Sequence, residues 1–228
     1  MIDFSKLTAF ELQAGAHDTA AEGLCAMEAV AWLEGVEHSD RPSCTCPVIA
    51  AFVRSINDRM PDSDRQKLVA YLPRLVGTVS PEHEQERAEY LAWHAITVVA
   101  PGVLERAGLK HHAATLRGLG RHDWEAAAAF ADAAAAAASY AADADASARA
   151  ASYAAAAAAR AAASYAADAA DAAAFYAADA ADAAACANAD CEGALTMLDG
   201  VLAIGPQSAG FSADTEARVA AYRELVAV

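Results

Sequence analysis

The densest group of side chains with chemical capability lies early in the chain. Within thirty residues the sequence brings together thiols, imidazoles and carboxylates: His17, Cys25, Glu28, His38, Asp40, Cys44 and Cys46. Thiolate and imidazole are the ligands that zinc prefers in proteins. Zinc is therefore the candidate cofactor, with Cys44 and Cys46 as the first metal ligands. The remaining ligands would come from His38, Cys25 or His17, since no second C-x-x-C motif completes the site.

The same residues also have a structural interpretation. Cys25 and Glu28 are one helical turn apart, so we expect Glu28 to face inward, and a buried carboxylate needs a partner. The loop of residues 36–46 is the expected source of that partner, through backbone N–H groups, Arg41 or Arg54. In this interpretation the group organises a loop that contacts a ligand or partner, and its candidate residues are His17, Glu28, His38, Asp40 and Arg54.

An enzymatic interpretation has less support in the sequence. If a thiol were nucleophilic, Cys44 beside His38 would be the pair to consider. The chain contains no Walker A loop, no G-x-G-x-x-G, no G-x-S-x-G and no H-E-x-x-H. We therefore favour a protein that is not an enzyme and assign no catalytic residue.

Proline, glycine and apolar periodicity predict helices throughout the first half of the chain. These helices are expected over residues 20–35, 47–60, 62–72, 81–99 and 109–119. Asp18 or Thr19 would cap the first helix, Pro73 would stop or kink the third, and Pro101 would end the fourth. No alternating run is long enough for a strand. The sequence predicts an all-α protein in which residues 1–120 form a compact helical bundle.

The next region is dominated by alanine. Residues 121–192 contain neither glycine nor proline, and alanine has the highest helix propensity of all residues. A single uninterrupted helix of this length would measure on the order of 100 Å. Folding back on itself is the alternative. The predicted organisation is therefore a head (1–120), an alanine-rich arm (121–192) and a C-terminal segment (193–228) with one short helix.

Residues 164–185 contain two copies of an eleven-residue unit that differ only at its first position. Eleven residues return to within about 20° of the same helix face, which places Asp, Tyr and Phe on one side. The rest of the surface is alanine and would let another helix approach closely, as in a coiled coil. We expect homo-oligomerisation through an interface of Ala166, Ala169, Ala170, Ala173, Ala177 and Ala180.

Two alternatives to self-association stay open for the tract. One is an intrinsically stable lone helix that acts as a spacer. The other is ice binding, because an alanine-rich helix with an eleven-residue period resembles the helical type I antifreeze proteins of fish. Those proteins place threonine at the repeat position, where this chain has tyrosine or phenylalanine beside aspartate.

Composition restricts the partners and the compartment. The net charge is −15, and we find no Lys/Arg cluster of the kind that nucleic acid or an anionic membrane surface requires. The first residues do not form a signal peptide, and no window offers roughly 18 strongly hydrophobic residues. We therefore expect a cytoplasmic protein. Its five cysteines would then be reduced, without a disulfide framework.

Several motifs in residues 15–78 resemble an uncharacterised protein family of actinobacteria and their bacteriophages. The shared pattern is a His before the first helix, C-x-M-E, S-D-x-P-x-C before a Pro-led helix, N-D and P-R-L-V-G-T. In this chain it comprises His17, Cys25, Met27, Glu28, Ser39, Asp40, Pro42, Cys44, Pro47, Asn57, Asp58 and residues 73–78. The resemblance implies an actinobacterial or phage origin and no known activity. It also implies that the residues around the first loop form a site.

The preferred hypothesis is a non-enzymatic protein whose arm oligomerises and whose head recognises a protein or small ligand. The second hypothesis is a metal-dependent protein or enzyme that uses the cysteines and histidines of the head. The third is ice binding by the tract.

Overall fold

The computed structural model of the chain is mainly helical in the part that it describes. That part comprises residues 7, 10–121, 123–141, 155–157, 160–161, 191–211 and 214–226. Over these residues it contains no strand, only an isolated bridge between Leu12 and Leu24. The all-α prediction is confirmed. The chain divides into two compact units, Met1–His83 with Leu202–Val228, and Glu84–Val201.

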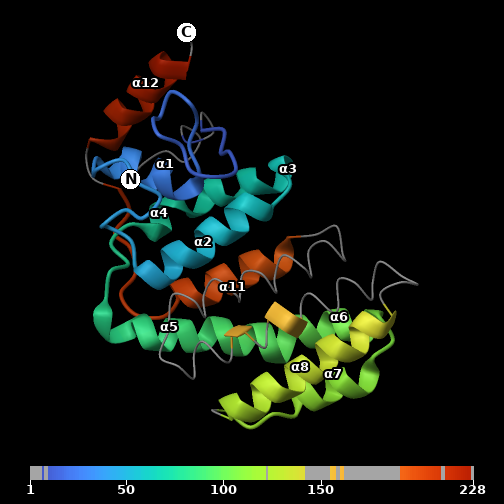
Figure 1. Cartoon of the computed structure of the whole chain (residues 1–228). Coiled ribbons are helices and arrows are strands. Elements are labelled where there is room, and N and C mark those ends of the chain that lie inside the picture. The colour runs from blue at the N-terminus through green and yellow to red at the C-terminus, as the bar shows by residue number, and fades with distance from the viewer. Residues whose placement is uncertain are drawn as a thin grey trace. The chain divides into compact units, whose positions relative to one another are not determined.

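The first unit is built around its first two helices, which pack against each other (Figure 1). Its elements are α1 (Ala26–Glu34), α2 (Pro47–Arg59), α3 (Asp62–Arg65), the 3-10 segment η2 (Gln66–Tyr71), α4 (Leu72–Leu75) and α12 (Thr215–Val226). The face of α2 that was predicted to be apolar is buried, with Ile49, Phe52 and Ile56 in the core. Pro47 begins α2, as expected, because the first helical position needs no N–H donor.

The C-terminal helix α12 packs on α1 within this unit. The Tyr222 ring stacks on Phe10 at a centroid distance of 4.5 Å and meets the edge of Trp32 at 6.1 Å. Trp32 Nε1 donates to the backbone oxygen of Arg218 over 3.0 Å. These contacts make the last helix part of the N-terminal unit.

The first helix begins later than the sequence predicted. Neither Asp18 nor Thr19 caps it, because residues 18–22 form turns and α1 starts only at Ala26. Gly23 has φ +141°, a conformation that side chains rarely adopt, and it takes the chain out of the turns into Leu24. The cap is Cys25, which the prediction placed inside the helix.

The second unit contains most of α5 (Pro81–His94), followed, in the part of the chain that the structure describes, by further helical elements. These are the π-helical segment η3 (Ala95–Val99), α6 (Ala100–Arg106), α7 (Lys110–Arg117), α8 (Trp124–Ala141) and most of α11 (Glu192–Leu202). The prediction that Pro101 ends the helix was wrong. The Ala100 N–H donates to the Ala95 oxygen, and Pro101 falls in the first turn of α6, where its missing N–H is tolerated.

The start of the alanine tract packs inside the second unit. The buried face of α8 repeats at intervals of four, three and four residues, and it consists of Ala127, Ala131, Ala134 and Ala138. This face shares one hydrophobic cluster with Ile96, Val103 and Leu116. Residues on both sides of position 120 therefore belong to the same core, so the predicted head boundary does not separate compact units.

The tract then folds back, which was the alternative to one long helix. Ala155 belongs to the same cluster as the buried face of α8. Ala161 packs with Ala92, and Trp124 lies against both. In an uninterrupted helix Trp124 and Ala161 would be about 55 Å apart, so the single 100 Å arm is wrong. No described helix is long and apolar enough to span a bilayer.

The repeat of residues 164–185 lies outside the described residues. So do all six alanines of the predicted interface: Ala166, Ala169, Ala170, Ala173, Ala177 and Ala180. The oligomer, spacer and ice-binding interpretations of this segment therefore stay predictions.

Candidate functional site

The early cluster is organised by a capping box at the start of α1. Cys25 is the N-cap, and its Sγ accepts a hydrogen bond from the Glu28 backbone N–H at 3.5 Å. In return, Glu28 Oε2 accepts from the Cys25 backbone N–H at 2.8 Å. The motif is a C-x-x-E version of the S/T-x-x-E capping box, with a thiol in place of the hydroxyl. It holds the Glu28 carboxylate inside the unit, where the residue is 1% exposed.

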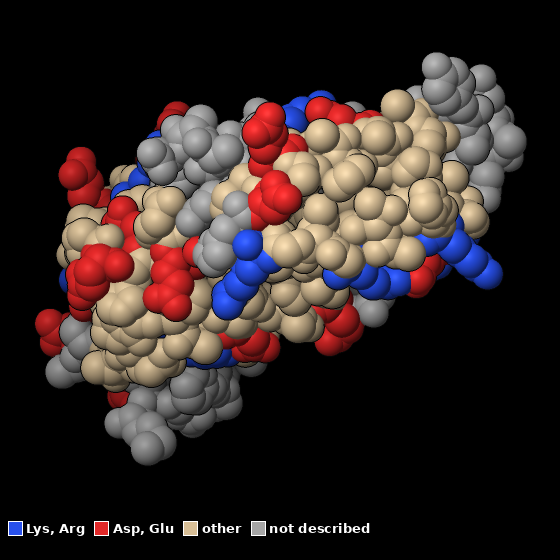
Figure 2. All heavy atoms as spheres, turned by 90° about the horizontal axis from the view of Figure 1, so that it is seen from below, with Lys and Arg blue, Asp and Glu red and all other residues tan. Residues whose placement is uncertain are grey.

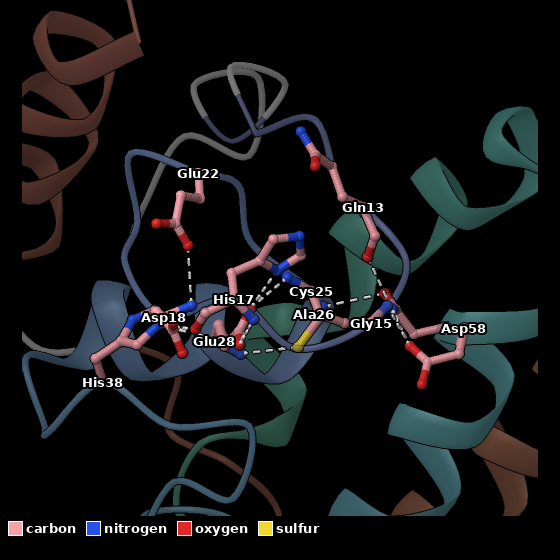
Figure 3. Close-up of polar contacts among 11 residues, drawn as sticks. Gln13, Gly15, His17, Asp18, Glu22, Cys25, Ala26, Glu28, His38 and Asp58 are labelled. Carbon is pink, nitrogen blue, oxygen red and sulfur yellow. Dashed lines mark hydrogen bonds and ion pairs between the residues drawn. The ribbon is translucent and has the colours of Figure 1, made fainter.

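His17 supplies the other partners of this carboxylate (Figure 3). Its backbone N–H donates to Glu28 Oε1 over 2.7 Å, and its ring Nδ1 donates to Oε2 over 2.9 Å. Both carboxylate oxygens are therefore occupied by donors from residues 17 and 25. The inward orientation of Glu28 is confirmed. Its hydrogen bonds come from residues 17 and 25 rather than from the predicted loop of residues 36–46, whose His38 ring approaches Oε1 to 4.0 Å. Neither Arg41 nor Arg54 contacts it in the described structure.

The ionisation of the cluster follows from its surroundings. Burial alone would raise the pKa of the Glu28 carboxyl, but the hydrogen bonds from His17 and Cys25 outweigh it and lower this pKa below its ordinary value. Burial raises the pKa of the Cys25 thiol to about 12. Glu28 is therefore an ionised acceptor at neutral pH, and Cys25 is a neutral thiol rather than a nucleophilic thiolate.

His38 completes the innermost contacts. Its Nε2 donates to the backbone oxygen of His17 over 2.8 Å and lies 4.0 Å from Glu28 Oε1. Carbonyl and carboxylate oxygens can only accept, so the proton sits on Nδ1 of His17 and on Nε2 of His38. The rings are 12% and 29% exposed, respectively. Each ring therefore keeps one nitrogen that these bonds do not use.

Side chains of α2 and η2 hold the backbone that leads into this cluster. Asn57 Oδ1 accepts from the Ala26 N–H at 3.1 Å, and Asn57 Nδ2 donates to the Gln13 oxygen at 2.9 Å. Asp58 Oδ1 accepts from the Gly15 N–H at 2.8 Å. The neighbouring backbone is held by Gln66, which bonds both the N–H and the oxygen of Leu12. We call the innermost residues the N-terminal clamp: His17, Cys25, Glu28, His38 and Asn57.

Asp40 and Arg54 form a separate brace. Arg54 Nε lies 3.5 Å from Asp40 Oδ2, and Arg54 Nη1 donates to the Asp40 oxygen over 3.3 Å. Both side chains are partly exposed. This pair ties the loop of residues 36–46 to α2 and does not touch the carboxylate of Glu28.

The cysteines of the C-x-C motif are held by backbone contacts. The Cys46 N–H donates to Thr78 Oγ1 over 3.0 Å, and the Gly77 N–H donates to the Cys44 oxygen over 2.8 Å. Burial raises the pKa of the Cys44 thiol, which disfavours its thiolate. His38 donates to His17 rather than to Cys44.

The predicted metal ligands do not gather into a metal site in the described structure. Among the described residues, no three His, Cys, Asp or Glu side chains are arranged to hold a metal ion. Cys25 serves as a helix cap, while Cys44 and Cys46 lie at the start of α2.

Sequence reasoning missed one part of the clamp and one residue that supports the backbone beside it. The C-x-x-E signature at Cys25 was present in the sequence, although thiols are not the usual capping side chains. The role of Gln66 had no local signal, because its partner Leu12 lies 54 residues away. Asn57 and Asp58 entered the sequence analysis only through the family resemblance.

We find no match to this chain among protein-family models, among curated proteins or among solved structures. The geometry of the clamp is therefore the basis for a functional proposal.

Proposed function

We propose that this protein is a non-enzymatic binding protein that self-associates through its alanine-rich tract. In this proposal the N-terminal clamp presents the loop of residues 36–46 to a protein or small-molecule partner. The supporting observation is the saturation of Glu28, whose two oxygens accept three hydrogen bonds from fixed donors. A carboxylate used in this way stabilises the fold and is not free to act as a general base.

The clamp fixes the conformation of the loop of residues 36–46 before a partner binds. His38 is itself a member of the clamp, and its bond to the His17 backbone oxygen fixes one position of the loop. The ion pair between Asp40 and Arg54 of α2 fixes another. On either side of these anchors, Glu37, Arg41 and Ser43 are exposed. A loop that is ordered before binding loses less conformational entropy on association, which favours a role in recognition.

Close packing of alanine inside the second unit supports the proposed role of the tract. The alanine face of α8 is fully buried against larger side chains of the same unit. Residues 164–185 repeat the same composition with an even more regular spacing. We propose that their alanines pack against the equivalent segment of a second copy, because small side chains permit close approach of two helices.

Leucine substitution tests the proposed interface. The double variant Ala169→Leu/Ala173→Leu should raise the dissociation constant of the oligomer about tenfold or more, because the larger side chains wedge the helices apart. Native mass spectrometry and sedimentation velocity would measure the oligomer. The matched control is Ala129→Leu/Ala133→Leu, which has the same spacing at exposed positions of α8. An oligomer that both variants leave unchanged would contradict the proposed interface.

A metal-dependent function is the second candidate, and one observation favours it. His17 and His38 each donate one ring N–H to an oxygen acceptor of the chain. Outer-shell bonds of this kind orient histidines in metal sites. Zinc is the candidate metal, and His17 Nε2 and His38 Nδ1 would be the free ligand atoms.

Zinc retention separates the two candidates. Under the preferred proposal, we expect less than one zinc ion per ten chains after incubation with excess zinc and dialysis, because the two histidines lack further ligands. Elemental analysis by plasma mass spectrometry would measure the ratio. One zinc per chain that disappears in His17→Ala/His38→Ala would favour the metal-dependent function instead.

A further inference from the structure

Residues 106–122 form a positively charged segment in an otherwise acidic protein. The chain carries a net charge of −15, and acidic side chains are spread over the face drawn in Figure 2, with several Lys and Arg side chains along one border. Residues 106–122 nevertheless contain no acid. Their basic residues are Arg106, Lys110, Arg117 and Arg121, accompanied by three histidines.

The packing of α6 against α7 gathers part of this segment on one surface. Arg106 ends α6, Lys110 begins α7 and Arg117 ends it. All three are exposed. We call Arg106, Lys110 and Arg117 the basic surface of the second unit.

One carboxylate faces these cations. Arg117 forms a two-pronged ion pair with Glu105, in which Nη2 donates to Oε2 over 2.9 Å and Nη1 contacts Oε1. The pKa of Glu105 lies below its ordinary value chiefly because of the hydrogen bond from Arg117, with Lys110 and Arg106 adding to it. A single acid therefore stands among three cations.

Two of these cations are only partly compensated, through the charge of Glu105. Arg106 and Lys110 make no ion pair within the described structure, and α7 has no acidic residue in its first turn. Lys110 also stands at the positive end of the α7 dipole, where a cation is unfavourable. An acidic partner would relieve this repulsion.

The chain itself contains a segment with the complementary charge. The repeat of residues 164–185 carries four acids and no base, and its acids recur at the eleven-residue spacing: Asp168, Asp171, Asp179 and Asp182. In a helix this spacing would return the aspartates to one side, opposite the alanine face. The repeat could therefore present charge to one neighbour and alanine to another.

We infer that the basic surface of the second unit is a docking site for the aspartates of residues 164–185 in a second copy of this chain. This inference rests on the proposed self-association and specifies its charged contact. In a two-fold dimer this contact would occur twice, with the repeat of each copy against the basic surface of the other. Because the groups are exposed, salt should weaken it: the Debye length falls from about 10 Å at 0.1 M to about 3 Å at 1 M.

Charge reversal tests the inference on the full-length chain. The variant Arg106→Glu/Lys110→Glu should raise the dissociation constant of the oligomer about tenfold in 20 mM salt. Wild type in 0.5 M salt should show a similar loss, and the variant should respond little to salt. Sedimentation velocity would measure association, and circular dichroism would confirm that the variant is folded.

Complementation provides the control. The variant Asp168→Lys/Asp179→Lys should associate weakly by itself, and mixing it with Arg106→Glu/Lys110→Glu should restore association. This recovery requires the two charged regions to meet in different copies. Misfolding of either variant would not restore association on mixing.

Three results would overturn the inference. If the oligomer is insensitive to salt and to charge reversal but is weakened by Ala169→Leu/Ala173→Leu, the charged contact is contradicted and the proposed self-association is supported. If the wild-type chain is monomeric in both salt conditions, the charged contact and the proposed self-association are both contradicted. Binding of a mixed-sequence single-stranded DNA to wild type, lost on charge reversal, would assign the basic surface to nucleic acid instead.

Discussion

Replacing Glu28 by glutamine should lower the free energy of unfolding by about 3 kcal/mol, because an amide cannot accept all the donors that surround this carboxylate. The three donors are the backbone N–H groups of His17 and Cys25 and the ring of His17. In the variant the amide NH₂ would face at least one of these N–H groups and leave it unsatisfied in a buried position. Urea denaturation monitored by circular dichroism would measure the difference in unfolding free energy.

The matched control is Glu37→Gln, the same substitution at an exposed position of the following loop. It should change the free energy of unfolding by less than about 0.5 kcal/mol, as surface substitutions usually do. A loss of similar size in both variants would mean that Glu28 has no special stabilising role.

The contribution of Glu28 should also depend on pH. Its folded-state pKa lies below the ordinary value of 4.5, so folding favours the ionised form. The stabilisation is therefore fully present above the unfolded-state pKa and is lost as the pH falls through the folded-state pKa. The difference in unfolding free energy between wild type and Glu28→Gln should shrink between about pH 6 and pH 3. A constant difference across this range would contradict the assignment of the lowered pKa to this carboxylate.

This site shows how far local sequence reasoning reaches. The spacing of Cys25 and Glu28 predicted an inward carboxylate, and its burial is confirmed. The loop of residues 36–46 was expected to supply the partners, through backbone N–H groups, Arg41 or Arg54, but its contribution is the His38 ring at 4.0 Å from Oε1. Neutral backbone donors satisfy the carboxylate instead, and their convergence depends on how residues 12–24 return toward α1, which no short motif encodes.

The alanine tract shows a different limit. Helix propensity correctly predicted α8, because alanine favours a helix in any context. Propensity could not predict that Ala155 and Ala161 return to the second unit, since alanine provides no glycine or proline signal for a reversal. What decides the return is tertiary packing against Ala92 and Trp124, which lie outside or at the edge of the tract.

The prediction of one short helix in residues 193–228 was wrong, because the structure forms α11 as well as α12. Gly200 lies inside α11, and its presence there has a steric reason. A Cβ placed on Gly200 would lie only 1.8 Å from the Tyr90 hydroxyl oxygen and 2.3 Å from the ring carbon that bears it. Tyr90 belongs to α5, and burial together with Asp199 raises the pKa of its hydroxyl. Glycine inside a helix is normally unfavourable, so its presence here is explained by the close approach of this ring.

Replacing Gly200 by alanine should therefore destabilise the protein by about 2 kcal/mol, because the added methyl group would force the Tyr90 ring out of its position. Gly193→Ala is the matched control in the same helix, where a Cβ meets no atom within 4 Å. That substitution should be neutral or stabilising by about 0.5 kcal/mol, since alanine restricts the unfolded chain and favours the helix. Thermal and urea unfolding of both variants would measure the contrast.

In a Tyr90→Leu background the cost of Gly200→Ala should fall by at least half, because the clashing ring is gone. Equal effects of the two glycine substitutions would show that helix propensity, rather than the packing of α5 on α11, determines the residue at position 200.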